Sequence, residues 1–136
     1  MRRVLAPASA VSSFLAFDFG AKRVGVASGN SLTRSATPLS TVAVQGEARL
    51  EAIARLVAEW RPTALVVGVP FHPDGTAHVN TERARRFGRQ LKARFGLPVH
   101  EVDERYTTTE AKAAGAPDLD AASAALILEQ FLASDA

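Results

Sequence analysis

One apolar run near the middle of the chain limits the folds that are open to it. Residues Ala64–Val69 are continuously apolar, which is typical of a short strand that is covered on both faces. The segment before this run, Gly46–Trp60, and the segment after it, Thr81–Phe95, carry apolar side chains at helical spacing. A covered strand between two amphipathic helices predicts an α/β protein, with a sheet packed between layers of helices.

Other segments supply the remaining strands and a last helix. Strand-like runs occupy Phe14–Asp18, Arg23–Ser28, part of Leu32–Leu39 ending near Pro38, and Pro98–Asp103. The first two are joined by a short turn, so we expect a hairpin. A capping-box pattern at Thr107–Glu110 predicts the start of a short helix, and Asp118 is placed to cap the final helix. The order β-β-β-α-β-α-β-α predicts a mixed five-stranded sheet with helices on both faces.

Apolar stripes predict which side of each helix faces the sheet. Positions three or four apart lie on the same helix face. The buried positions expected on this basis are Leu50, Ile53, Ala54, Val57 and Trp60 in the first helix, Ala84, Phe87, Leu91 and Phe95 in the second, and Leu119, Ala122, Leu126, Ile127 and Phe131 in the last. Gly96 is well placed to end the second helix.

Composition narrows the class further. Apolar residues make up 47% of the 136 residues, a normal share for a globular protein, so we expect one domain over 14–136 after a tail over 1–13. Arg2 and Arg3 precede a short apolar stretch that resembles a signal peptide, but Pro7 breaks it and a tail is the better interpretation. No apolar run approaches the roughly 20 residues of a membrane span. The chain has no cysteine, which fits a cytoplasmic location.

Positive charge is concentrated in one segment. The formal net charge is only +2, but residues 81–95 hold Glu82 against six basic residues, namely Arg83, Arg85, Arg86, Arg89, Lys92 and Arg94. Arginine suits phosphate because of its forked donor geometry. The segment is either a solvated helix face or a surface for a polyanion, and Arg83, Arg86 and Arg89 are our candidate nucleic-acid contacts.

Three acidic residues are spaced along the chain as if to meet at one point. Asp18 ends the first strand, Glu104 follows the last strand, and Asp120 lies in the first turn of the last helix. Ligands of such sheets sit at the carboxyl ends of parallel strands, and clustered carboxylates are the ligands that Mg²⁺ prefers. The sequence therefore predicts a site for Mg²⁺ or Mn²⁺ at which a phosphodiester is hydrolysed.

Each acid also has a purely structural interpretation. Asp18 could cap the bend at Gly20, Glu104 could pair with Arg105 on the surface, and Asp120 could compensate the helix dipole. Taken alone, dipole compensation is the better interpretation of Asp120. Only the combination of the three acids favours a catalytic site.

Two basic residues follow the first acid, and several well-known catalytic and nucleotide-binding motifs are absent from the sequence. Lys22 and Arg23 could contact a phosphate or be exposed hairpin charges. The sequence holds no Gly-x-x-x-x-Gly-Lys loop, no Gly-x-Gly-x-x-Gly fingerprint and no serine-centred nucleophile elbow. It therefore offers no signal for the common nucleotide-binding loops or for serine-hydrolase chemistry.

Four groups of residues occur in the order found in a known family. They are Ala16–Ala27, then Val66–Pro70 with Asp74–Thr76, then Asp103–Thr108 with Glu110 and Ala111, then Asp120–Ala124 with Ile127 and Leu128. Together they resemble the YqgF/RuvX family over about residues 14–133. The resemblance implies a ribonuclease-H-like fold, a bacterial cytoplasmic protein, and metal-dependent hydrolysis of a phosphodiester by Asp18, Glu104 and Asp120.

The resemblance also implies the substrate and partners. Family members are described as nucleases that mature the 5′ end of pre-16S rRNA, and earlier as Holliday junction resolvases. The partner expected is therefore pre-16S rRNA, or alternatively a four-way DNA junction. We expect the protein to be a monomer or a homodimer, and we expect no membrane partner. Lys22, Arg23, Arg105 and the arginine-rich helix would hold the nucleic-acid backbone.

The chain departs from the family in one segment, and two other hypotheses stay open. Family members usually carry a longer basic segment before the last acidic motif, where this chain has only Lys112–Leu119. The shortened segment leaves room for a non-catalytic RNA-binding module of the same fold. An ATP-binding fold of the actin/hexokinase type is suggested by Asp18-Phe19-Gly20, but that fold uses two such domains and 136 residues supply one.

Overall fold

A computed structural model describes residues 11–104 and 118–134 of the chain. Its elements are β1 (Ser13–Phe19), β2 (Val24–Asn30), β3 (Ala36–Val42), α2 (Gly46–Trp60), β4 (Ala64–Val69), α3 (Thr81–Phe95), β5 (Val99–Asp103) and α5 (Leu119–Ser134). This is the predicted order of strands and helices. The capping box predicted at Thr107–Glu110 and the candidate contact Arg105 lie outside the described residues.

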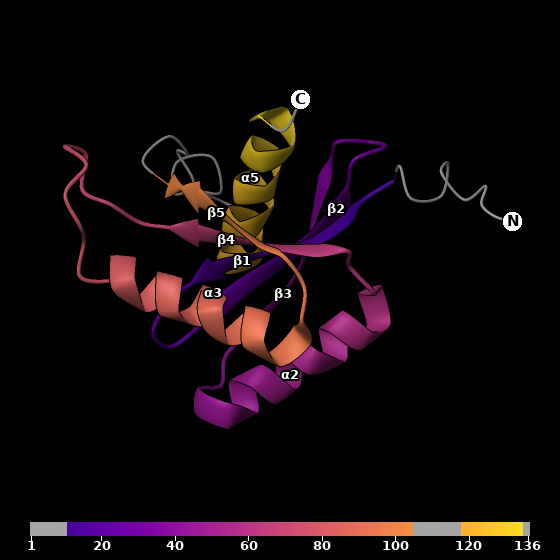
Figure 1. Ribbon diagram of the computed structural model, residues 1–136, viewed down its shortest axis with the longest axis horizontal. Helices are drawn as coiled ribbons and strands as arrows, with labels where there is room; N and C mark the ends of the chain where they lie inside the picture. Colours follow the sequence, from indigo (N-terminus) through magenta and orange to yellow (C-terminus); the bar gives the residue numbers. More distant parts are fainter. Residues whose placement is uncertain (1–10, 105–117, 135–136) are drawn as a thin grey trace, which may run out of the picture.

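The five strands form one mixed sheet (Figure 1) in the order β3-β2-β1-β4-β5. β2 is antiparallel to both β1 and β3, whereas β4 is parallel to both β1 and β5. The predicted hairpin and mixed sheet are confirmed. Asp18 pairs with Gly68, and Gly68 pairs with Val102, so the carboxyl ends of β1, β4 and β5 lie next to one another.

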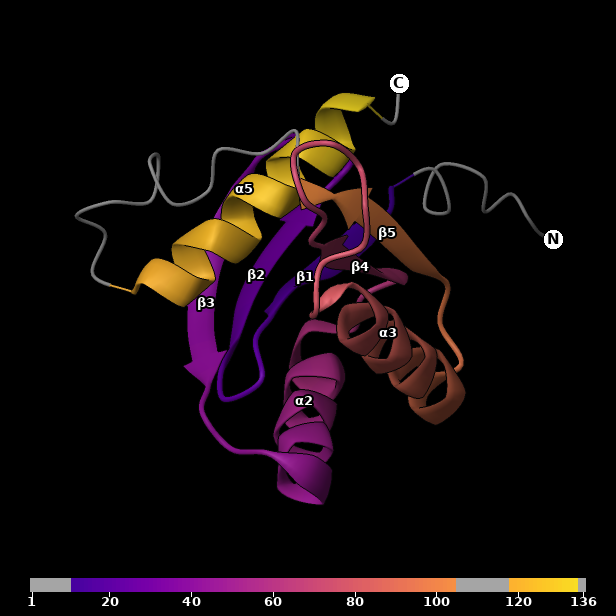
Figure 2. The same ribbon diagram turned by 90° about the vertical axis from the view of Figure 1, so that its left-hand side faces the viewer.

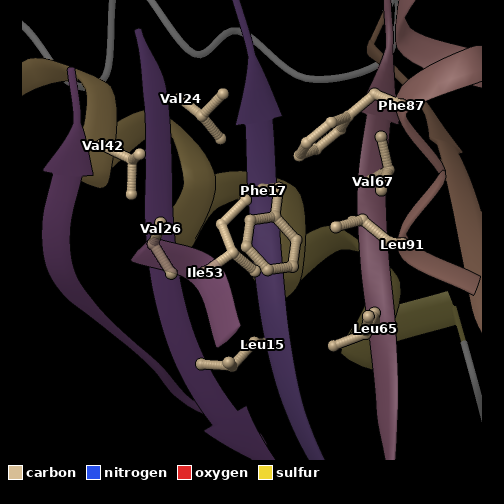
Figure 3. Packing of buried hydrophobic residues seen from close by; sticks show 10 residues of the cluster. All are labelled: Leu15, Phe17, Val24, Val26, Val42, Ile53, Leu65, Val67, Phe87 and Leu91. Atoms are coloured by element: carbon tan, nitrogen blue, oxygen red, sulfur yellow. The ribbon is translucent and has the colours of Figure 1, made fainter. Parts of the chain in front are cut away.

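Helices cover both faces of the sheet, with α2 and α3 on one face and α5 on the other (Figure 2). The core on the α2/α3 face contains Leu15, Phe17, Val24, Val26, Val42, Ile53, Leu65, Val67, Phe87 and Leu91 (Figure 3). The core under α5 contains Phe14, Ala16, Ala64, Val66, Val102, Ile127, Leu128 and Leu132. Because side chains alternate along a strand, Asp18 shares the face of Ala16 under α5, and Phe19 shares the face of Phe17.

The third strand begins later than its sequence pattern predicts. It was expected within Leu32–Leu39, but it covers Ala36–Val42. A turn occupies the preceding residues, because the Asn30 side chain accepts backbone hydrogen bonds from Leu32 and Thr33 at 2.9 Å each. Pro38 lies inside the strand rather than at its end. A proline is tolerated there because β3 is an edge strand.

The apolar stripe predicts the buried face of α3, where Ala84, Phe87 and Leu91 are buried as expected. The prediction is weaker for α2 and α5. Of the positions predicted in α2, only Ile53 is buried, Leu50 and Val57 are half-buried against the core, and Trp60, in the last turn, is 43% exposed. Of the five positions predicted in α5, only Ile127 is buried; the buried face consists of Ala121, Ser123, Ala124, Ala125, Ile127, Leu128 and Leu132. This helix is apolar nearly all round, so periodicity could not select one face.

The ends of the helices follow expectation. Gly96 adopts a left-handed conformation at the end of α3, with φ 67°, and its N–H bonds to the Lys92 carbonyl.

None of the helices in the two described ranges combines the length and the apolar character that crossing a membrane requires.

Candidate functional site

Two of the predicted acids lie at the carboxyl ends of the strands that flank β4. Asp18 is the last residue but one of β1, and Glu104 directly follows β5. Gly68 of β4 pairs with Asp18, and a β-carbon added to Gly68 would come within 3.0 Å of the Glu104 Cδ atom. The glycine therefore leaves the space in which the Glu104 side chain reaches across β4. The carboxyl groups of Asp18 and Glu104 share a hydrogen bond.

Burial and mutual repulsion determine the charge of this pair. Burial raises the pKa of Asp18 to about 6, with a further increase from the nearby carboxylate of Asp120. Burial also raises the pKa of Glu104 to about 8, and the charge of Asp18 adds to this effect. At neutral pH Glu104 is therefore protonated and donates to the ionised Asp18 carboxylate, because one shared proton relieves the repulsion between two close acids.

The third acid is brought to the site by the start of α5. Asp118 caps this helix, since its Oδ1 atom accepts a backbone N–H from the first turn at 3.0 Å and the Thr41 hydroxyl at 2.6 Å. These bonds, with that of Thr41 the strongest, lower the pKa of Asp118. Gly25 lets the helix approach β2, because a β-carbon there would lie 1.9 Å from the Asp120 carbonyl oxygen. As a result, Asp120 is close enough to raise the pKa of Asp18.

The side chain of Asp120 is paired with the hairpin turn between β1 and β2. The Arg23 Nε atom lies 3.0 Å from Asp120 Oδ2. The pair borders a hollow of about 380 Å³ that is lined by Gly20, Ala21, Lys22, Arg23 and Asp120. Two of the predicted nucleic-acid contacts, Lys22 and Arg23, therefore lie beside one of the three acids.

The three acids fit a divalent cation in their chemistry. Residues 11–104 and 118–134 contain no group of three Asp, Glu or His side chains that is already arranged to hold a metal ion. Asp120 is paired with Arg23, while Asp18 and Glu104 share a hydrogen bond. The donor set nevertheless consists of carboxylate oxygens, which hard cations prefer. The pKa values of Asp18 and Glu104 are raised first by burial and then by repulsion from neighbouring acids, and a bound cation would relieve that repulsion.

The arginine-rich helix α3 does not act as one surface. Three of its arginines are paired with acids: Arg85 with Glu101, Arg89 with Glu82, and Arg94 with Glu47. Arg83 and Arg86 belong to none of the ion pairs found within the described ranges, and both line a cavity between α2 and α3. The structure thus places Arg83 and Arg86 on the face of the sheet opposite Asp18. Arg89 forms its ion pair with Glu82, a residue of the same helix.

Sequence reasoning assigned no role to three residues that position the acids. They are Gly25, Gly68 and Thr41, and each acts through a close approach between segments far apart in the chain. A glycine inside a strand is a recognised sign that another backbone or side chain comes close. Gly25 and Gly68 carried that signal, whereas nothing in the sequence marked Thr41.

The strand order, the helices on both faces and the acids at the strand ends define a protein of the ribonuclease-H-like class. The fold is similar to that of a structure described as "T. thermophilus RuvC in complex with Holliday junction substrate", with a TM-score of 0.61 and 18% identity over 90% of this chain and 95% of that one. A second structure of Thermus thermophilus RuvC matches with a TM-score of 0.52 and 15% identity, over 89% of this chain and 96% of that one.

The chain belongs to the RuvX family, whose sequence model, described as a Holliday junction resolvase, matches residues 12–134. A relative from Polaromonas sp. is 66% identical over 91% of this chain and 90% of its own, and it carries the name "Putative pre-16S rRNA nuclease". A relative from Albidiferax ferrireducens with the same name is 63% identical, over 93% of this chain and 81% of its own. The family description and these names are those of nucleases, which are hydrolases of phosphodiester bonds.

Proposed function

We propose that this chain is a divalent-metal-dependent nuclease whose active site consists of Asp18, Glu104 and Asp120. The observation that carries the proposal is the half-buried pair of Asp18 and Glu104, which share a hydrogen bond at the carboxyl ends of two strands and have raised pKa values. Acids whose pKa values are strongly perturbed by burial and by a neighbouring acid are concentrated at functional sites. Membership of the RuvX family supports the same reaction class.

The three acids would hold Mg²⁺ or Mn²⁺ through their carboxylate oxygens. When bound, the cation lowers the pKa of water and stabilises negative charge at the phosphate. The protein contributes rigid placement, since Asp18 and Glu104 stand at the ends of sheet strands and Asp120 is held by a capped helix. Loading the site requires Glu104 to lose its proton and Asp120 to release Arg23, which would leave that guanidinium free for a phosphate oxygen.

The substrate that we propose is pre-16S rRNA, cut during maturation of its 5′ end, in the cytoplasm. The names of the relatives at 66% and 63% identity support RNA. Lys22 and Arg23 border the hollow beside Asp120 and would position the backbone without reading its sequence. A four-way DNA junction is the alternative substrate, which the family description supports.

One observation favours a second candidate function, a non-catalytic RNA-binding module. Asp120 is paired with Arg23 rather than open towards the other two acids. If this pair persists in the presence of a cation, only two carboxylates would be available for binding it. Such a protein would still hold RNA through its basic residues.

A side-by-side cleavage assay separates these functions. A pre-16S rRNA 5′-leader fragment and a four-way DNA junction are incubated with Mg²⁺ or Mn²⁺ and with wild type, Asp18→Asn or Glu59→Gln, the last being a control on the exposed side of α2. We expect Asp18→Asn to reduce RNA cleavage at least about a hundredfold, because a metal ion supplies several kcal/mol of transition-state stabilisation and about 1.4 kcal/mol corresponds to tenfold in rate. Glu59→Gln should cleave like wild type.

Each other outcome has a definite meaning. Undiminished metal-dependent cleavage by Asp18→Asn contradicts the proposed site. Cleavage of the junction alone identifies a resolvase. RNA that is bound but not cut by wild type identifies the non-catalytic module.

A further inference from the structure

A second site lies on the face of the sheet that is turned away from the three acids. Between α2 and α3, which lie side by side (Figure 2), is a cavity of about 460 Å³, a size typical of small-ligand pockets. It is lined by Phe19, Gly46, Glu47, Arg49, Leu50, Arg83, Arg86, Phe87 and Gln90. Phe19 follows Asp18 directly, so this cavity opens at the same end of β1 as the acids but on the opposite face.

Arg49 is an unusual residue for such a position. It is only 8% exposed, and burial lowers the pKa of its guanidinium. Its Nε atom donates to the Val44 carbonyl and its Nη2 atom to the Ala21 carbonyl, each at 3.0 Å, and its Cζ atom lies 5.5 Å from the centre of the Phe19 ring. No carboxylate pairs with it among the described residues.

The guanidinium of Arg49 therefore retains both charge and donors. A guanidinium carries five N–H groups, and the two bonds to carbonyl oxygens leave three of them for another acceptor. A buried cation without a counter-charge is unfavourable unless an anion joins it. The two carbonyl bonds fix its orientation, so binding would cost little conformational freedom.

The other charged residues around the cavity add to this positive potential. Arg83 and Arg86 line it and take part in none of the ion pairs within the described ranges. The one acid in the lining, Glu47, is neutralised by Arg94, whose Nη1 atom lies 2.7 Å from Glu47 Oε2. The amino end of α2 also borders the cavity, and the side chain of its N-cap residue, Gln45, makes no capping hydrogen bond, so the positive end of the helix dipole adds to the attraction for anions.

We propose that this cavity, formed around Arg49, Arg83 and Arg86, binds a phosphate group of nucleotide chemistry. The phosphate could belong to a nucleotide of the substrate strand next to the cleavage point or to a free nucleotide. Its assignment to the substrate strand rests on the proposed nuclease function. The pocket itself does not, because none of its lining residues is one of the three acids.

Binding measured in EDTA tests the pocket without using catalysis. The probes are inorganic phosphate, adenosine 5′-monophosphate and a short single-stranded RNA, titrated by calorimetry into wild type and into the double variant Arg83→Gln with Arg86→Gln. The matched control is Arg55→Gln with Arg61→Gln, which removes two exposed arginines of the α2 segment outside the cavity. A further variant, Gln90→Glu, adds a repelling charge while all arginines stay.

We expect the pocket double variant to bind RNA at least about tenfold more weakly than the control double variant. For the pocket double variant, the slope of log K against log salt concentration should become less steep by about 0.7 for each phosphate that the variant no longer neutralises. Gln90→Glu should weaken binding in the same direction. Tighter binding of the nucleotide than of RNA would identify a free nucleotide as the ligand and would still support the pocket.

Two results would overturn the proposal. One is equal weakening by the two double variants, because this would reflect only overall charge. The other is unchanged affinity for all three probes in both pocket variants. The outcome is independent of the cleavage assay: if Asp18→Asn cuts RNA normally while the pocket variants bind the probes weakly, the nuclease site is wrong and the pocket stands.

Discussion

At the scale of single residues, the nuclease function that we propose depends on carboxyl groups whose pKa values are raised by burial. Asp18 and Glu104 share a proton because two ionised carboxylates within hydrogen-bonding reach of each other, partly removed from water, would repel each other. The same feature that makes the pair unfavourable for folding would make it suitable for a cation. In the function that we propose, stability and activity are therefore in opposition at these two residues.

A pH-dependent gain in stability is expected from Glu104→Gln in metal-free buffer. The pKa of Glu104 in the folded protein is raised to about 8, so wild type loses stability as pH rises from the ordinary carboxyl value through about 8. Glutamine cannot ionise and avoids this loss. Because a change of one in pKa corresponds to about 1.4 kcal/mol, we expect a gain on the order of 1–3 kcal/mol at pH 8 and little at pH 5.

Urea unfolding in EDTA at the two pH values measures this effect, with Glu59→Gln as the control at an exposed acid. If Glu104→Gln has the same free energy of unfolding as wild type at both pH values, Glu104 is not buried beside Asp18 in solution.

At the scale of elements, the site depends on how closely α5 lies against the sheet. The first turn of this helix rests on β2 at Gly25, and its cap at Asp118 is tied to β3 through Thr41. Small residues along the buried face of α5, among them Ala121, Ala124 and Ala125, allow the same close approach farther along the helix. The position of Asp120 therefore depends on backbone packing more than on its own side-chain contacts.

Gly25→Ala should both destabilise the protein and displace Asp120. The added β-carbon would lie 1.9 Å from the Asp120 carbonyl oxygen, so the helix must move, and overpacking of this kind costs about 1–3 kcal/mol. Cleavage should fall more than the decrease in the fraction of folded protein explains. The cleavage rate and the folded fraction are measured at a temperature where most of the variant is still folded.

Gly88→Ala is the matched control. Its β-carbon would meet Val99 Cγ1 at 3.4 Å, which is an ordinary contact, and alanine favours the helix interior by about 1 kcal/mol. Gly88→Ala should therefore be neutral or stabilising. If Gly25→Ala and Gly88→Ala change stability and cleavage equally, the close approach of α5 to β2 is not what makes Gly25 necessary.

At the scale of the whole molecule, one sheet separates two sites of opposite charge. Acids gather under α5, while Arg49, Arg83 and Arg86 gather between α2 and α3, and both groups lie near the carboxyl end of β1. A strand of nucleic acid could pass over this end of the sheet and contact both faces. The main core on the α2/α3 face packs against the strands of this sheet (Figure 3).

Divalent cations should stabilise the whole fold if they bind the three acids. A ligand that binds only the folded state adds about 2.7 kcal/mol at a hundred times its Kd. We expect Mg²⁺ or Mn²⁺ to raise the Tm of wild type by thermal scanning, and more so near pH 8 than near pH 6, since protons compete for Glu104. Asp18→Asn should lose most of this response, and an equal response in Asp18→Asn would place the binding site elsewhere.

The sequence by itself determined most of the fold because its signals are local. The periodicities of Gly46–Trp60 and Thr81–Phe95 and the apolar run Ala64–Val69 predicted these three elements with the bounds that the structure shows. The positions of the acids after strands and at a helix start also followed from nearby residues. The strand directions then followed from short connections and from helices between strands.

The tertiary structure alone decided how these parts meet. The buried face of α5, the later start of β3 and the pairing of Asp120 with Arg23 each depend on residues distant in the chain. The same is true of the cavity around Arg49, whose donors are oriented by Val44 and Ala21. Periodicity describes one element at a time, whereas close approach, burial and the pKa values that result from them are properties of several elements packed together.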